Sequence, residues 1–161
     1  GVSNLDLQGE LNTVRPFTYS HSDTIANYTH YNQPLAHPLG ANFVELAGIV
    51  NYQPLPKWRA SLTLVAFRQG IDTAGKNYGS NIFLPYTTRS MDYGNYTGSG
   101  VKTTGINSTL WIGYELKENL FLDASFLFRK FSVAYLPALS SQTTLFTLGI
   151  RLNMARRVYD Y

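Results

Sequence analysis

Apolar and polar residues alternate along most of this 161-residue chain, and no other feature of the sequence constrains its fold as strongly. Near the start, for example, Leu5, Asp6 and Leu7 begin a run in which every second residue is polar. Successive side chains of a β-strand point to opposite faces, so a period of two predicts strands with one apolar and one polar face. The period recurs in six segments, which we predict as strands near residues 4–19, 41–53, 57–68, 104–117, 119–131 and 143–154.

The lengths of these strands and of their connections favour a membrane. Each predicted strand has roughly 10 to 14 residues, whereas globular strands usually have about 5 to 6 and a tilted membrane-crossing strand needs about 9 to 11. The connections "QPLPK" at 53–57 and "KEN" at 117–119 are short, and they alternate with long segments at 20–40, 69–103 and 132–142. All tight turns therefore fall at one end of the sheet, as in an outer-membrane barrel.

We predict an all-β fold, an antiparallel transmembrane β-barrel of which this chain supplies about six strands. Single-chain bacterial barrels start at about eight strands, and an open edge in lipid would leave amides unpaired. We therefore expect residues 1–161 to be a single region, the carboxy-terminal part of a larger barrel. The chain begins at Gly1 without a leader, as a processed product or a fragment would. The alternative is a soluble sandwich or lipocalin-like barrel, whose apolar face turns inward.

Composition narrows the class of protein further. Charged residues make up 14% of the chain, against about 25% in a typical soluble domain. The formal charge of +3 is too small and scattered to indicate nucleic-acid binding. Without cysteine, the chain has neither a disulfide nor a Cys-based zinc site. No run approaches 18 apolar residues, so a transmembrane helix is excluded.

The barrel prediction assigns a side to each strand residue. The lipid-facing set is predicted to include Leu62, Leu64, Leu110, Ile112, Leu122, Phe126, Leu148 and Ile150. Aromatic residues near the turn end suit an interfacial girdle, namely Tyr52, Trp58, Tyr114 and Phe121. The polar face carries acids and arginines that suit a hydrogen-bonded network in a lumen, namely Asp6, Glu10, Glu45, Arg59, Glu115, Asp123, Arg129 and Arg151. Trp111 interrupts this polar face.

All three histidines fall between residues 21 and 37, which raises the question of a site. His21, Asp23, His30 and His37 are suitable metal ligands, but their spacing matches no familiar zinc pattern. We favour the alternative that His30 and His37 make hydrogen bonds within a loop held by nearby prolines. Ser20, His21 and Asp23 stand too close together in sequence to converge as a nucleophilic triad. We therefore predict no catalytic residue, no metal and no cofactor.

The long segments also carry aromatic and amide side chains that suit adaptable binding of carbohydrate or protein. The candidate binding residues are His30, Tyr31, Asn32, His37, Tyr78, Tyr86 and Tyr93. The alternative is that Gly and Asn in these segments serve only turns.

Two stretches, "YTHYNQPLAHPLGANFVE" (28–45) and "GIRLNMARRVYDY" (149–161), resemble the carboxy-terminal region of a gliding-motility outer-membrane protein family, the RemB-type proteins. That family is related in style to outer-membrane capsule-assembly barrels. The resemblance covers about the last third of such a protein. It implies an integral outer-membrane barrel in a bacterium with gliding or surface-secretion machinery, and it carries over no active site.

The expected function is a non-enzymatic, integral outer-membrane component of a bacterial cell-surface complex, in motility or surface assembly. Its expected partners are outer-membrane lipid, other outer-membrane or periplasmic proteins of that complex, and polysaccharide, with no nucleic acid. Two alternatives stay open. One is a channel or glycan-binding barrel for capsule or nutrient handling, and the other is an outer-membrane hydrolase that uses the histidine loop at 21–37.

Overall fold

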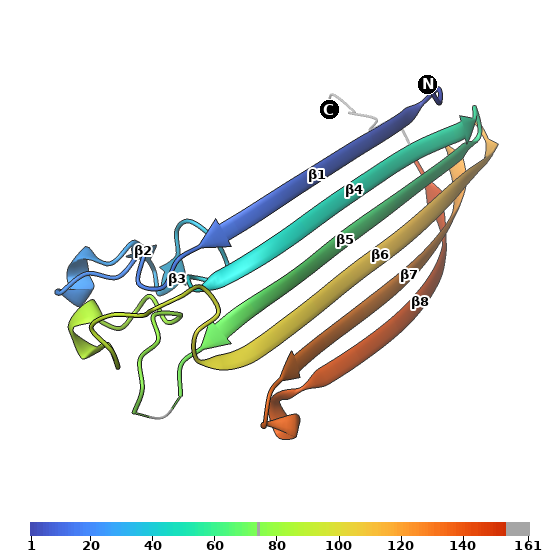
Figure 1. Ribbon diagram of the computed structural model, residues 1–161. Coiled ribbons are helices and arrows are strands. Elements are labelled where there is room, and N and C mark those ends of the chain that lie inside the picture. The colour runs from blue at the N-terminus through green and yellow to red at the C-terminus, as the bar shows by residue number, and fades with distance from the viewer. Residues whose placement is uncertain (74, 154–161) are drawn as a thin grey trace, which may run out of the picture.

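Six long antiparallel strands lie side by side in one twisted, curved sheet, which makes the protein all-β (Figure 1). The computed structural model describes residues 1–73 and 75–153. The strand order is β1-β4-β5-β6-β7-β8, so every long strand pairs with its neighbours along the chain. Their bounds are β1 Leu5–Val14, β4 Phe43–Leu55, β5 Trp58–Ile71, β6 Val101–Lys117, β7 Leu120–Val133 and β8 Ser141–Leu152. Among the described residues, β1 and β8 each pair with only one of these strands.

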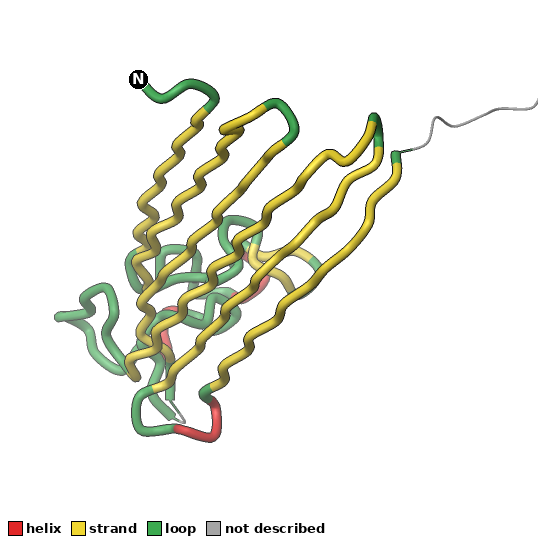
Figure 2. Tube along the Cα trace, turned by 90° about the vertical axis from the view of Figure 1, so that its right-hand side faces the viewer, coloured by secondary structure: helices red, strands yellow, loops and turns green. Residues whose placement is uncertain are grey.

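Short turns collect at one end of the sheet and long loops at the other, which confirms the predicted sorting (Figure 2). The turns are the two-residue connections 56–57 and 118–119, and the loops are residues 15–42, 72–100 and 134–140. In their described residues the loops hold only short elements: η1 Thr24–Ala26, β2 Thr29–His30, β3 Gln33–Pro34, η2 Tyr86–Thr88 and η3 Pro137–Leu139. In the part of the chain that the structure describes, no helix is long and apolar enough to span a bilayer.

The strand boundaries differ from the prediction mainly at the loop end. β1 ends at Val14 and not near residue 19. Pro16 removes a backbone donor, and Phe17 has a φ of 62° and donates its N–H to the carbonyl of Gly79, 3.1 Å away. The chain therefore leaves the sheet to dock on the 72–100 loop. Conversely, β5 and β6 extend further than predicted, as far as the pair Ile71–Val101. Residue 154 of the last predicted strand lies outside the described residues, as does the rest of "MARRVYDY".

The register brings the apolar sides of all six strands to one face. Directly paired residues of an antiparallel sheet share a face. One cross-strand row contains Leu7, Val50, Leu62, Leu110, Phe126 and Phe146. The adjacent row, on the opposite face, contains Asp6, Asn51, Ser61, Trp111, Ser125 and Thr147. The predicted alternation is therefore confirmed across the whole sheet, and we call the two sides the apolar face and the polar face.

The buried core lies at the loop end and not against the sheet's apolar face. The buried hydrophobic residues are Ala41, Phe43, Ile82 and Val133, of which Ile82 belongs to the 72–100 loop and the others to strand ends or their flanks. Most of the large aliphatic side chains of the apolar face are instead exposed. The fold thus buries its loops against one another and leaves the apolar side of its sheet uncovered.

Candidate functional site

The main candidate site is the apolar face itself. Each of the eight residues predicted to face lipid is exposed, by between 37% for Ile112 and 74% for Ile150. A soluble monomer rarely exposes a contiguous apolar patch larger than about 300–600 Å². Here the exposed rows cross all six strands. Such a face requires a covering partner or an apolar solvent.

The apolar band runs obliquely across the strands. One cross-strand row consists of Leu11, Leu46, Ala66, Ile106, Lys130 and Gln142. The residues of this row are apolar from β1 to β6 and polar on β7 and β8. On β8 the last apolar residue toward the loop end is Phe146, four residues closer to the turn end than Gln142. The edge of the band therefore shifts by four residues, each about 3.4 Å long, across five strand spacings of about 4.8 Å. The edge is inclined by roughly 30° to the direction perpendicular to the strands.

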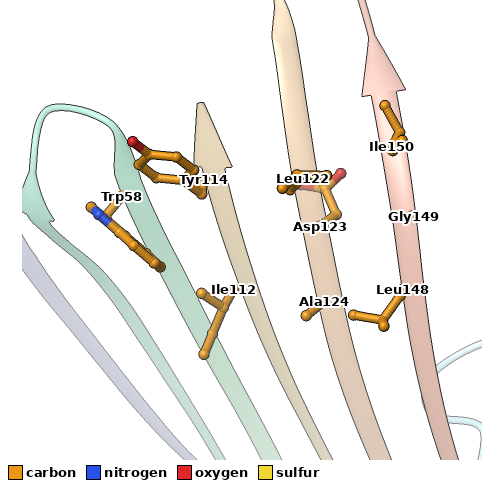
Figure 3. Close-up of a pocket in the computed structure, with 9 residues that line it drawn as sticks. All are labelled: Trp58, Ile112, Tyr114, Leu122, Asp123, Ala124, Leu148, Gly149 and Ile150. Carbon is orange, nitrogen blue, oxygen red and sulfur yellow. The ribbon is translucent and has the colours of Figure 1, made fainter. Parts of the chain in front are cut away.

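Aromatic residues mark the turn end of the apolar face. The rings of Trp58 and Tyr114 are paired across strands with centroids 4.7 Å apart. They border a shallow groove of about 570 Å³ that is also lined by Ala124 and Gly149, whose side chains are small or absent (Figure 3). Phe121, predicted as a fourth girdle residue, lies on the polar face, because it pairs with Glu115 and Arg151. The Arg151 guanidinium stacks over its ring at 4.2 Å.

In its described residues the polar face holds three small hydrogen-bonded groups and two arginines that form no ion pair; in one of the groups the Ser61 hydroxyl donates to Asn51 Oδ1 at 2.8 Å. Asp123 binds Arg151 through two contacts of 2.8 and 3.3 Å. At the loop end, Glu45 accepts a hydrogen bond from Asn12 at 3.2 Å and contacts His37. Among the described residues, Arg59 and Arg129 form no salt bridge. The predicted network is therefore present in parts of this face.

Aromatic rings on the polar face lie over glycines. A Cβ on Gly105 would stand 2.1 Å from the ring of Phe67, its direct cross-strand partner. A Cβ on Gly113 would stand 2.6 Å from the ring of Trp111. The missing side chains let both rings lie flat against the sheet. This explains how Trp111 fits among the polar residues of this face.

Asn42 joins the two longest loops to the sheet. It is fully buried with a φ of 64°, and its Nδ2 donates to the carbonyls of Gly70 at 2.6 Å and Ser99 at 2.7 Å. Its Oδ1 accepts the N–H of Gly98 at 2.6 Å. The side-chain amide of Asn42 thus makes hydrogen bonds with backbone groups at the end of β5 and in the 72–100 loop.

Asp72 orders the start of the 72–100 loop in a similar way. Its Oδ1 accepts the N–H of Tyr78 at 2.6 Å, and its Oδ2 accepts that of Asn81 at 2.9 Å. The N–H of Asp72 donates to the hydroxyl of Ser80 at 3.1 Å. The carboxylate is therefore occupied by backbone donors, and the loop is a folded unit.

His37 is held in one tautomer by its neighbours. The N–H of Leu39 donates to Nδ1 at 3.2 Å, so the ring proton resides on Nε2, which donates to Glu45 Oε1 at 3.1 Å. The ring also packs against Phe43 at 4.5 Å between centroids. Pro38 occupies the turn that the Gly40 N–H closes on the His37 carbonyl at 2.9 Å. Both ring nitrogens are thus engaged within the folded loop.

The other histidine-loop residues do not gather around a point. The carboxylate of Asp23 caps η1 by accepting the N–H of Ile25 at 3.0 Å. His30 packs edge-on against Tyr31 in the β2–β3 hairpin. Within residues 1–73 and 75–153, no three His, Cys, Asp or Glu side chains are grouped so that they could hold a metal ion.

The candidate binding residues divide into two sets. His30, Tyr31 and Asn32 lie at the tip of the hairpin, where Tyr31 is 89% exposed and both Tyr31 and Asn32 have positive φ. Tyr93, on the 72–100 loop, is 90% exposed and Tyr86 is also exposed. By contrast, the ring of Tyr78 lies beside Gly100, and His37 turns toward the polar face. The structure does not bring these seven residues into one pocket.

Sequence reasoning missed the two loop-ordering residues and three cations. Asn42 was identifiable only as one polar residue before an apolar strand, and Asp72 only as an acid in a Gly-rich loop. Arg68, Lys102 and Lys130 occupy apolar-face positions of their strands, next to the loop end. In the sequence, these three residues could have been recognised as cations at positions where the two-residue alternation predicts an apolar side chain.

Comparisons with known proteins found no matching family model, no matching curated protein and no matching solved structure. The structure defines the class directly: an all-β chain with a six-stranded antiparallel sheet that is apolar on one exposed face.

Proposed function

We propose that this chain forms part of the wall of a β-barrel in a bacterial outer membrane. Its apolar face would contact lipid, its polar face would line the lumen, and the long loops would lie outside the cell. In this role the chain is a non-enzymatic component of a cell-surface complex for motility or surface assembly. The RemB-type resemblance of residues 28–45 and 149–161 suggests that biological setting.

The observation that carries the proposal is the exposed, continuous apolar face. In water, each exposed Leu or Phe on this face forgoes about 1.5–3 kcal/mol of burial free energy. In lipid the same side chains are solvated, and the polar side chains of the other face stay in water. The alternation that would be a defect in an uncovered soluble sheet thus suits a membrane barrel.

The dimensions of the apolar band support the same proposal. Strands of outer-membrane barrels tilt by about 35–45°, close to the inclination of roughly 30° of this band. Along β7 the band extends from Leu120 to Phe128, about 27 Å of strand. Tilting reduces that length to a height of about 22 Å, near the ~25 Å of barrel proteins. Trp58 and Tyr114 would lie at the periplasmic interface.

A pair of neighbouring substitutions tests the proposal. In Leu110→Arg a cation enters the apolar face at mid-strand, and in Thr109→Arg the same cation enters the polar face. Arginine at the lipid-facing midplane costs roughly 2–4 kcal/mol. We expect full-length protein with Leu110→Arg to be lost from the urea-resistant outer-membrane fraction, and Thr109→Arg to remain there.

The control separates membrane contact from simple intolerance of arginine in β6. If both variants insert as well as the unmodified protein, the apolar face does not contact lipid. If both fail equally, the strand rejects arginine for packing reasons, and the proposed orientation loses its support.

A further inference from the structure

In the described strands every charged residue on the apolar face is a cation. Three of these four cations lie at the loop end, and the fourth, Lys117, ends β6 at the turn end, where it pairs with Leu120 after a bulge. Arg68 is on β5, Lys102 on β6 and Lys130 on β7, three adjacent strands. Their register partners are Thr104, Gly70 and Ile106, respectively, which places all three on the apolar face. Asp and Glu are absent from this face in the described strands. We call Arg68, Lys102 and Lys130 the cationic rim.

The cationic rim borders the apolar band directly. On β5 the last apolar residue before Arg68 is Ala66, and on β7 Phe128 precedes Lys130. The strand spacings put the three backbone positions roughly 8 to 14 Å apart. Long side chains with exposed ends can converge on one group across that distance. The rim is therefore a positive strip at the boundary of an apolar surface.

The rim cations have no acidic partner in the described part of the chain. All three residues are exposed, and none takes part in a salt bridge. The Arg68 guanidinium lies alongside the 72–100 loop, with Nε 3.6 Å from the place where a Cβ of Gly98 would stand. That contact holds one cation at the rim without neutralising it. Hydroxyl and amide side chains surround the rim, namely Thr104, Ser132, Gln142 and Thr144.

We propose that the cationic rim binds the phosphate groups of lipids in the leaflet on the loop side of the membrane. This inference rests on the proposed function, because only a membrane-inserted sheet puts its apolar band among acyl chains and its rim at headgroup depth. Arginine offers a phosphate paired donors and lysine a compact charge. A phosphorylated glycolipid would present acyl chains to the band and phosphate to the rim at the same time. Free phosphate or an acidic protein would use only the rim.

The test compares two charge-matched double variants of the full-length protein in neutral detergent micelles. Lys102→Gln with Lys130→Gln removes two rim cations and leaves the Arg68 contact with the loop intact. Arg59→Gln with Arg129→Gln removes two cations from the polar face. Affinity for a bisphosphorylated glycolipid, and for phosphatidylcholine as the lipid without net charge, is measured by native mass spectrometry. Insertion into phosphatidylcholine vesicles is measured in parallel by flotation.

Each basic side chain near a membrane surface contributes about a five-fold change in binding to anionic lipid, so the rim variant should lose roughly 25-fold in affinity. The polar-face variant should bind the phosphorylated glycolipid as the unmodified protein does. Equal loss in both variants, or no loss in the rim variant, overturns the lipid-phosphate site. Unmodified protein that does not insert into vesicles overturns the proposed function and the site together. Inserted protein that does not prefer the phosphorylated lipid overturns the site alone.

Discussion

At the scale of single residues, the loop end depends on side chains that satisfy backbone groups. The Asn42 side chain makes hydrogen bonds with four backbone groups of two segments, and His37 connects its own loop to Glu45 on the sheet. The polar residues of these loops suggested a binding site in the sequence, yet several of them make the hydrogen bonds that hold the loops in their folded conformation. His37 therefore makes hydrogen bonds that hold its loop to the sheet, and His30 packs against Tyr31 in the β2–β3 hairpin.

Replacing Asn42 by Ala should destabilise the loop end by about 3 kcal/mol, because buried backbone partners lose their hydrogen bonds and alanine disfavours positive φ. Asn32→Ala is the matched control, since Asn32 has a φ of 58° but is exposed. We expect the control to cost only about 1 kcal/mol. Hydrogen exchange at the Gly98 amide should accelerate by about 100-fold in Asn42→Ala. An equal effect of the two variants would mean that the backbone conformation, and not the amide contacts, dominates.

At the scale of strands, the flat packing of rings on glycines couples β5 to β6. Phe67 lies over Gly105 on the polar face, where the sheet has no second layer among the described residues. Because the partner is a glycine, the aromatic ring can lie parallel to the sheet and contact the backbone of the neighbouring strand. Strand periodicity predicted the positions of both residues, whereas only the register shows that they are direct partners.

Gly105→Ala should lower the free energy of unfolding by about 1–3 kcal/mol, because the new methyl group would overlap the Phe67 ring. Gly149→Ala serves as the control, since a Cβ there meets nothing within 4 Å. The control should be neutral or stabilise by up to about 1 kcal/mol. Urea titration of the folded full-length protein measures both values. A neutral Gly105→Ala would show that the Phe67 ring moves aside without loss.

At the scale of the whole molecule, the two sheet edges dominate the energetics of the proposed barrel. β8 pairs only with β7 among the described strands, and each of its residues is exposed. Unpaired amides in lipid cost several kcal/mol each, so a barrel requires another strand beside β8 and another beside β1. Because β1 and β8 are the outermost of six antiparallel strands, they run in opposite directions, as the two edges of a sheet that closes into an antiparallel barrel must.

In the membrane-inserted full-length protein we therefore expect every amide of β8 to be protected from hydrogen exchange. In an antiparallel edge strand the residues alternate, so about half of the amides would otherwise face away from β7 and exchange freely. β6, which is paired on both sides, is the internal control. Rapid exchange at alternate β8 residues, with β6 protected, would contradict barrel closure at this edge.

The sequence alone determined the number of long strands, the side of each long strand that is apolar, and the sorting of turns and loops to opposite ends. These follow from local rules, since a period of two and the position of turn residues do not depend on distant contacts. The tertiary structure decided where β1 ends, because Phe17 docks on a loop more than sixty residues away. It also decided that Arg68, Lys102 and Lys130 lie together. Such placements depend on register between strands, and long-range pairing is set by the whole sheet and not by any one segment.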